Sequence, residues 1–388
     1  EEINGRFGLK CGDEILKQFS RCMQSCINEN QKIYELGNGR FIIMDLANHT
    51  KEDILELYDE LKKSVEVALE ESDYRIVYTI SVGIVEIDKE MKDYDTLIKY
   101  SEFALNEAKK KGKNSCYFFT QDKYKQFIRR REIRVGLQNA VDHNFNNFDV
   151  YYQPIIDIHT RNLIGAEALM RFKMKRNEQI EFVSPAEFIP ILEESGLIIP
   201  TGRWILRQAV ACCKKWQEFI PEFKVNVNLS YVQIIKSKIL DEIKQALKDF
   251  NLKPALLGIE VTESGYLENT YHYKKLWSSL KEEGITLILD DYGTGYSNAY
   301  RLSDLTPHYI KIDRVLTQKA LFSNYERSIL IYIIEMAHSL KLNVCIEGVE
   351  TEEELQEIKK LNPDYIQGYL FGKPAPEDEF YNRQIKKK

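Results

Sequence analysis

The chain has 388 residues, of which 54 are basic and 60 are acidic, and its formal net charge is −6. Proteins that bind nucleic-acid polymers usually have an excess of basic residues, and this chain has none, so we predict that it does not bind DNA or RNA. The seven cysteines are odd in number and lack CxxC spacing, which argues against a disulfide framework or structural zinc site and favours a cytoplasmic location. Because the chain does not begin with methionine, we interpret it as a fragment whose full-length form could carry an N-terminal sensor or membrane segment.

The first ~120 residues alternate between helical and strand patterns. Apolar residues recur at helical spacing over three segments, 13–23, 51–69 and 94–111. Residues 76–87 are rich in Val, Ile and Tyr, which predicts a strand. Residues 32–45 predict a hairpin whose turn is Gly37-Asn38-Gly39. We therefore predict a separate domain over residues 1–121.

A charged stretch follows, and we predict a linker helix over residues 122–144. It contains the run Arg129-Arg130-Arg131. We interpret this run as the solvated face of the helix, and a nucleic-acid patch is the alternative.

From about Phe148 onward, short apolar runs recur with helix-like segments between most of them. The runs cover residues 150–156, 163–172, 224–229, 256–262, 286–290, 309–312, 343–347 and 365–371. Eight such strands alternating with helices predict a (β/α)8 TIM-like barrel of the α/β class over residues 145–388. A doubly wound open sheet is the alternative, and the missing GxGxxG fingerprint argues against its dinucleotide-binding version.

Polar residues interrupt these strands or follow their ends. They are Glu167, Asn228, Glu260, Glu263, Asp290, Asp291, Lys311, Asp313, Glu347 and Glu350. In a barrel, the carboxyl ends of the strands form one mouth, so these side chains would converge there. Because buried carboxylates need compensation, and oxygen ligands suit Mg²⁺ or Mn²⁺, the pattern indicates a metal site. Two such ions can promote phosphodiester hydrolysis, so the pattern favours a metal-dependent phosphoester hydrolase without identifying its substrate.

Each element of this pattern also has a structural explanation. Asn228-Leu229-Ser230 could be a helix-capping sequence, and residues 290–295 could be a turn followed by a helix start. The repetition of the pattern over five successive predicted strands favours the metal site.

The same residues resemble the signature of the EAL phosphodiesterase family over roughly residues 130–385. The matching motifs are Tyr152–Ile155, Glu167–Arg171, Asn228–Ser230, Glu260–Glu263, Asp290–Ser297, Lys311–Asp313, Glu347–Glu350 and Gln367–Pro374. The resemblance implies a barrel whose mouth binds c-di-GMP and two divalent cations. It also implies hydrolysis of one phosphodiester bond to give linear pGpG, and a homodimer formed through the EAL domain.

The resemblance assigns a role to each matching residue. One metal would be held by Glu167, Asn228, Glu260 and Asp290, and the second by Asp290, Asp291 and Glu347. Lys311 would contact the nucleophilic water. Asp313, Glu350 and Gln367 are similar to the residues that support this centre. Asp313 would act at the metals, Glu350 would be a catalytic residue, and Gln367 would bind the substrate. Glu263 would hold the loop after the fifth strand. The residues that match dinucleotide contacts are Gln153, Leu169, Arg171 and Pro374. We expect Ca²⁺ to bind but to support little turnover, because this ion is larger than Mg²⁺ and its coordination geometry is more flexible.

The N-terminal part resembles the diguanylate cyclase (GGDEF) family at Gly12-Asp13, Ser81–Ile84 and Ala108–Asn114. Its signature positions read Gly37-Asn38-Gly39-Arg40-Phe41, so Gly39 replaces a metal-binding acid and a cation follows it. The first strand of that family, with its metal aspartate, is missing. We therefore predict a degenerate domain that does not synthesise c-di-GMP and serves packing or dimerisation, with a regulatory GTP-binding relic as the alternative.

Three functional hypotheses follow from these resemblances. They are an active phosphodiesterase, a catalytically silent c-di-GMP receptor, and a protein-interaction scaffold that ignores the nucleotide. The intact set of ligand residues favours the first.

Overall fold

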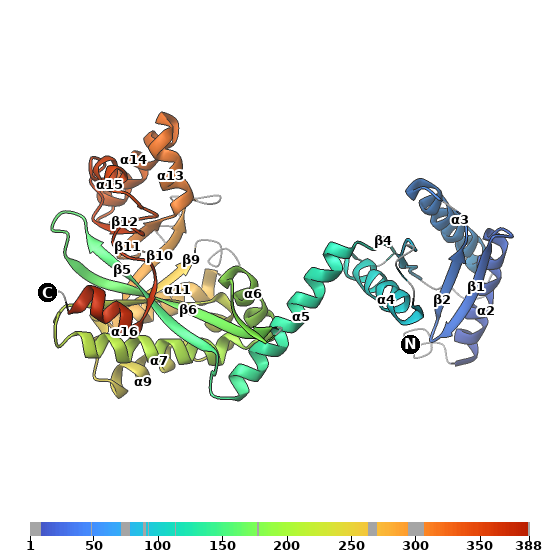
Figure 1. Ribbon diagram of the computed structural model, residues 1–388, viewed down its shortest axis with the longest axis horizontal. Helices are drawn as coiled ribbons and strands as arrows, with labels where there is room; N and C mark the ends of the chain where they lie inside the picture. The colour runs from blue at the N-terminus through green and yellow to red at the C-terminus, as the bar shows by residue number, and fades with distance from the viewer. Residues whose placement is uncertain are drawn as a thin grey trace. The chain divides into compact units, whose positions relative to one another are not determined.

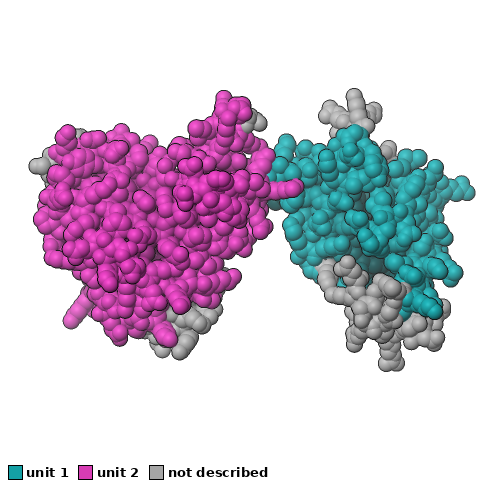
Figure 2. Space-filling view, turned by 90° about the horizontal axis from the view of Figure 1, so that it is seen from below, with its two compact units in different colours: residues 1–128 teal, residues 129–388 magenta. Residues whose placement is uncertain are grey.

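The computed structural model describes residues 9–47, 49–70, 78–87, 91, 93–112, 114–176, 178–262, 270–293 and 306–386. The chain forms two compact units, Glu1–Ile128 and Arg129–Lys388 (Figure 2). Over the described residues, we find no helix with the length and apolar character needed to span a bilayer.

Among the residues that the structure describes, the part of the first unit before residue 121 contains three helices and two pairs of strands. The helices are α2 (Leu9–Cys26), α3 (Lys51–Glu70) and α4 (Tyr94–Lys110), the antiparallel hairpin is β1 (Gln31–Gly37) with β2 (Arg40–Asp45), and the parallel pair is β3 (Val82–Ile84) with β4 (Cys116–Phe118). The predicted helices and hairpin are confirmed. The strand predicted over residues 76–87 is only three residues long within its described part, because β3 pairs with β4 over three positions.

The backbone conformation of the hairpin turn accounts for its Gly-Asn-Gly sequence. Gly37, Asn38 and Gly39 have φ values of 79°, 54° and 68°, in the region that Gly and Asn adopt at the least steric cost. The core beneath the hairpin lies between α2 and α3, where Met23, Leu61 and Val65 are buried.

Helix α5 (Gln121–Asp142) covers nearly all of the predicted linker helix. Its residues Ile133 and Leu137 are buried in the core of the second unit. Arg129 pairs with Glu187 at 3.1 Å and also with Glu181, and Arg130 pairs with Glu194. The interpretation of the arginine run as a solvated face is therefore wrong for Arg129, which is half-buried against acidic partners.

The second unit is a closed eight-stranded barrel (Figure 1). Its strands are β5 (Phe148–Asp157), β6 (Leu163–Arg176), β8 (Lys224–Asn228), β9 (Leu257–Thr262), β10 (Thr286–Tyr292), β11 (Tyr309–Ile312), β12 (Asn343–Glu347) and β13 (Tyr365–Gln367). They pair in this order, and β13 returns to β5. Two short strands, β7 (Gln179–Val183) and β14 (Ala375–Pro376), pair with β6 and β5.

The predicted barrel is confirmed, with one departure from a pure TIM barrel. Strand β5 is antiparallel to both of its neighbours, whereas the other barrel strands run parallel to one another. Only residues 158–162 join β5 to β6. A parallel crossover needs a dozen or more residues, so this short connection permits only a hairpin.

Helices cover the outside of the barrel. They are α6 (Pro185–Ser195), α7 (Ile198–Trp216), α8 (Tyr231–Lys236), α9 (Ile239–Asp249), η1 (Pro254–Leu256), α11 (Thr270–Glu282), α13 (Arg314–Phe322), α14 (Asn324–Ser339), α15 (Glu352–Lys359), α16 (Glu377–Phe380) and η2 (Tyr381–Ile385). Strand side chains alternate between the two faces of the sheet. Val225 and Val227 of β8 belong to the main core with these helices, and Asn226 and Asn228 alternate with them on the opposite face of the strand.

An apolar layer fills the lower part of the barrel, near the amino ends of its parallel strands. It contains Ile155, Ile288, Tyr309 and Cys345, with Ile164 and Tyr365 packed against them.

Candidate metal centre at the barrel mouth

A polar layer lies directly above this apolar layer. Two positions after Ile288, Tyr309, Cys345 and Tyr365, the same four strands carry Asp290, Lys311, Glu347 and Gln367. Because side chains in a strand repeat with a period of two, these residues share the inner face of the barrel. The fold thus brings together side chains that are far apart in the sequence.

Lys311 lies at the centre of the polar layer and is only 1% exposed. Its Nζ atom pairs with four carboxylates, at 2.9 Å from Glu167, 3.1 Å from Glu260, 3.3 Å from Asp290 and 2.7 Å from Glu347. Four carboxylates therefore surround a single ammonium group, which leaves an excess of negative charge in a buried site.

Amide groups fix the orientation of Glu167. Asn228 Nδ2 donates to Glu167 Oε1 at 2.8 Å, and Gln367 Nε2 donates to Glu167 Oε2 at 2.8 Å. The same Gln367 nitrogen donates to Gln153 Oε1 at 3.1 Å. Gln367 Oε1 is buried and has no hydrogen-bond partner within the described structure.

Asn226, which holds Glu260, was not predicted as a site residue from the sequence. Asn226 is 2% exposed, and its Nδ2 donates to Glu260 Oε1 at 2.9 Å and also to the Tyr309 hydroxyl. Gly258 makes room for it, because a Cβ atom at that position would lie 2.2 Å from Asn226 Oδ1. The alternation Val-Asn-Val-Asn in β8, with Asn228 already singled out, was the signal that could have identified Asn226.

The electrostatics of the site reflect its shortage of positive charge. Burial and the charge of Glu167 raise the pKa of Glu260 well above its usual range, and burial also raises the pKa of Asp290. Burial raises the pKa of Glu347 to about 8 even though Lys311 opposes the shift. Burial and Asp290 raise the pKa of Asp291 to about 6. A further cation would relieve this repulsion.

In Glu167 and Lys311, by contrast, the neighbouring groups favour the charged form of the side chain despite its burial. Burial opposes the charged form of Glu167, but Lys311 and the amide donors outweigh it, so the pKa of Glu167 is lowered. Burial likewise opposes the charged form of Lys311, but the surrounding carboxylates outweigh it and raise the pKa of Lys311 well above its usual value. The lysine therefore stays protonated at the centre of the site.

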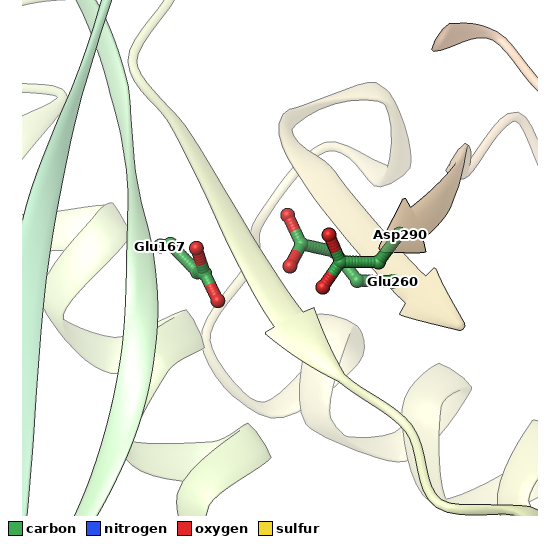
Figure 3. Close-up of side chains that lie close together, drawn as sticks. All are labelled: Glu167, Glu260 and Asp290. Carbon is green, nitrogen blue, oxygen red and sulfur yellow. The ribbon is translucent and has the colours of Figure 1, made fainter. Parts of the chain in front are cut away.

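Glu167, Glu260 and Asp290 form a group that could hold a metal ion. One ligand oxygen from each lies within 4.8 Å of the others, and Figure 3 shows the three carboxyl groups close together. Such an oxygen-only donor set suits hard divalent cations. Asp291 follows in the left-handed conformation, with a φ of 56°, and its N–H donates to Asp290 Oδ1 at 3.0 Å.

Asp313 and Glu350, which also have predicted roles, make contacts of their own. The Asp313 side chain caps α13 by accepting from the Val315 N–H at 2.7 Å. Glu350 pairs with Arg314 at 2.7 Å. Glu263 lies outside the described residues. The capping interpretation also holds for Ser230, which forms a capping box with Gln233 at the start of α8.

The residues predicted to contact the dinucleotide lie on β5, on β6 and directly before β14. Leu169 and Arg171 follow Glu167 at intervals of two along β6, and Gln153 is the register partner of Glu167 on β5. The Arg171 guanidinium lies 5.5 Å from the ring centre of Tyr151 and donates to the Met170 carbonyl. Pro374 is half-buried and immediately precedes β14, which pairs with β5 at Tyr152.

The fold and the cluster together define a class: an α/β barrel with an acidic, oxygen-only site at the carboxyl ends of its strands. Residues 134–374 match the EAL domain family, and the chain belongs to that family. Residues 1–115 match the family described as diguanylate cyclase, GGDEF domain. Both predicted resemblances are confirmed.

Similar proteins include two curated relatives. The signaling protein YkoW of Bacillus subtilis is 32% identical over 97% of this chain and 47% of its own length. The cyclic di-GMP phosphodiesterase PdeR of Escherichia coli is 29% identical over 100% of this chain and 58% of its own length. The chain thus spans about half the length of the curated relatives it matches.

A solved structure is similar to the barrel part. It is described as the PaMucR phosphodiesterase in complex with c-di-GMP, is 28% identical, and has a TM-score of 0.60. The match covers 64% of this chain and 99% of that one.

Proposed function

We propose that this protein hydrolyses one phosphodiester bond of c-di-GMP and releases linear pGpG. The observation that carries the proposal is the set of four carboxylates around the buried Lys311 at the mouth of an EAL barrel. The similarity to PdeR and to the PaMucR complex supports the choice of c-di-GMP as substrate.

The residues at the mouth fit divalent cations. A single ammonium does not balance four carboxylates, the donor set is made of oxygens, and Gln367 Oε1 is a buried acceptor without a partner among the described groups. Glu167, Asn228, Glu260 and Asp290 would hold one Mg²⁺ or Mn²⁺, and Asp290, Asp291 and Glu347 the second. When bound, these ions would lower the pKa of water and offset negative charge on the phosphoryl oxygens.

The residues predicted to contact the dinucleotide would bind and orient it. The guanidinium of Arg171 has a planar fork of donors that can pair with two phosphate oxygens at once. Leu169 and Pro374 would supply apolar contacts, and Gln153 and Gln367 would supply amide hydrogen bonds. Together they would place one phosphodiester group above Lys311.

Lys311 would hold the attacking water and offset charge in the transition state. Because its neighbours keep it protonated, it would act as a hydrogen-bond donor and not as a base. The water oxygen attacks phosphorus, the bond from phosphorus to the ribose O3′ breaks, and a proton passes to O3′. The products carry one new 5′-phosphate and one new 3′-hydroxyl. Glu347 would orient Lys311, and Glu350 would support this end of the site.

The GGDEF unit is proposed to be structural or regulatory and not a cyclase. At its signature turn, Arg40 pairs with Glu102 at 3.2 Å, where the family has a metal-binding motif. GTP binding at this unit and a homodimer formed through the EAL domain remain predictions.

Turnover of c-di-GMP with Mn²⁺ tests the proposal, with pGpG measured by chromatography. We expect product from the parent chain and none from Glu167→Ala. The matched control is Glu353→Ala, which removes an exposed carboxylate on α15 and should leave turnover unchanged. Absence of pGpG from the parent would contradict the proposal, and tight nucleotide binding without product would instead favour a silent receptor.

A further inference from the structure

The barrel contains a pocket at the end opposite the metal centre. The pocket has a volume of about 350 Å³, and we call it the basal pocket. Its lining includes the first residues of several strands: Lys224 of β8, Thr286 of β10, Tyr309 of β11, Asn343 of β12 and Tyr365 of β13. Asp290 and Glu347 of the metal centre lie four residues further along β10 and β12, so the two sites are at different levels of the barrel.

The basal pocket is lined by cations. Lys224, Lys281 and Lys341 line it together with His308, and no Asp or Glu is among its described lining residues. None of the three lysines pairs with a carboxylate that the structure describes, and Lys281 Nζ donates to the Thr306 hydroxyl at 3.0 Å. A concave site lined by charge of one sign concentrates ions of the opposite sign.

His308 adds a neutral donor to the pocket. Its Nδ1 accepts a hydrogen bond from the Leu287 N–H at 2.9 Å, which places the ring proton on Nε2. Burial, followed by the positive charges of Lys281 and Lys224, lowers the pKa of His308. The field of the two lysines therefore acts on groups inside the pocket.

The floor of the basal pocket is apolar and leads toward the metal centre. Ile155, Tyr309 and Tyr365 belong to the apolar layer of the barrel and also line the pocket. Asn226 lines it as well, and its Nδ2 donates to both the Tyr309 hydroxyl and Glu260. A molecule on this floor would lie one side chain away from Glu260.

We propose that the basal pocket binds a small phosphate ester, with its dianionic group among the lysines and a compact apolar or aromatic body on the floor. Its volume lies within the range of roughly 300–1,000 Å³ that is typical of small-molecule sites. The compact ammonium groups of the lysines suit a phosphate as point charges. The proposal does not depend on c-di-GMP hydrolysis, because it uses different residues at the other end of the barrel.

Calorimetric titration of phenyl phosphate into the whole EDTA-treated chain tests the proposal. We expect one molecule bound per chain, and binding at least tenfold weaker in the double variant Lys281→Gln, Lys341→Gln. The matched control is Lys319→Gln, Lys359→Gln, which removes two exposed lysines elsewhere on the barrel and should leave the affinity unchanged. Inorganic phosphate should bind more weakly than phenyl phosphate, because it lacks the body that covers the floor.

The proposal would be overturned if the parent did not bind phenyl phosphate at millimolar concentration. It would also be overturned if binding survived the double variant. If that surviving binding were lost in Arg171→Ala, the anion would occupy the mouth of the barrel and not the basal pocket. Equal affinity for inorganic phosphate and phenyl phosphate would overturn the assignment of an ester.

Discussion

The two units of this chain hold their signature residues in different physical settings. In the barrel, Glu167, Glu260 and Asp290 are buried around Lys311, and each depends on this shared lysine for compensation of its charge. In the GGDEF unit, the signature lies on a hairpin turn where Asn38, Gly39 and Arg40 are exposed. Unpaired charge is costly inside a barrel but not on an exposed turn. A turn can therefore lose its metal-binding acids without loss of fold, whereas the barrel cluster tolerates few changes.

Substitution of the central cation gives the largest expected effect. In Lys311→Met, four carboxylates lose the ammonium that they share. We expect the metal-free protein to lose about 3–5 kcal/mol of unfolding free energy, as when one partner of a buried ion pair is removed. Turnover should fall by roughly 10²–10³-fold, as when a group that stabilises the transition state is removed.

Urea unfolding in EDTA and the rate of pGpG release measure these two effects. Lys319→Met, which changes an exposed lysine of the neighbouring helix α13, is the control. If Lys311→Met matched this control in both measurements, the central role of the lysine would be wrong.

Replacement of Mn²⁺ by Ca²⁺ should separate binding from chemistry. Ca²⁺ takes more ligands in a more flexible geometry than Mg²⁺, so we expect c-di-GMP to bind while pGpG formation stays near background. Calorimetry and chromatography on the same sample measure the two quantities. Comparable turnover with Ca²⁺ and Mn²⁺ would contradict this expectation.

The Asn226→Leu substitution tests whether the amide of Asn226 positions Glu260 for metal binding. It removes the amide that donates to Glu260 while nearly keeping the side-chain volume. We expect Mn²⁺ affinity to fall by roughly 10–100-fold, as for other residues that orient metal ligands. The exposed Asn139→Leu on α5 is the control, and an affinity equal to that of the control would show that Asn226 does not position Glu260.

The smallest effect is expected at the degenerate turn. Arg40→Ala removes a surface ion pair with Glu102, so the free energy of unfolding should change by less than about 1 kcal/mol. Turnover of c-di-GMP should be unchanged, and neither parent nor variant should make c-di-GMP from GTP and Mg²⁺. Synthesis of c-di-GMP by the parent would contradict the assignment of a degenerate domain.

Much of the barrel could be predicted from the sequence because its strands are short apolar runs that end in polar residues. The direction of β5 was not predicted, since it depends on the short connection to β6 and not on the strand pattern. The convergence of Glu167, Glu260 and Asp290 follows from barrel closure, which places the inner faces of distant strands together.

Other features of the site could not be predicted from residue types alone. Asp313 precedes a helix, and its Oδ1 caps that helix by accepting from the Val315 N–H, a contact that its residue type alone does not reveal. Lys311 pairs with four carboxylates because it lies at the centre of the polar layer, and no local sequence pattern encodes that position. The basal pocket escaped prediction because Lys224, Lys281 and Lys341 come from separate segments that meet only when the barrel closes.

Calorimetric titration of Mn²⁺ into the EDTA-treated chain tests most directly the claim that the carboxylates around Lys311 are metal ligands. We predict two Mn²⁺ ions bound per chain, with proton release as Glu347 loses its proton, and binding that is lost or weakened by at least tenfold in Glu260→Gln. Absence of Mn²⁺ binding by the parent, or equal binding by Glu260→Gln, would contradict the claim.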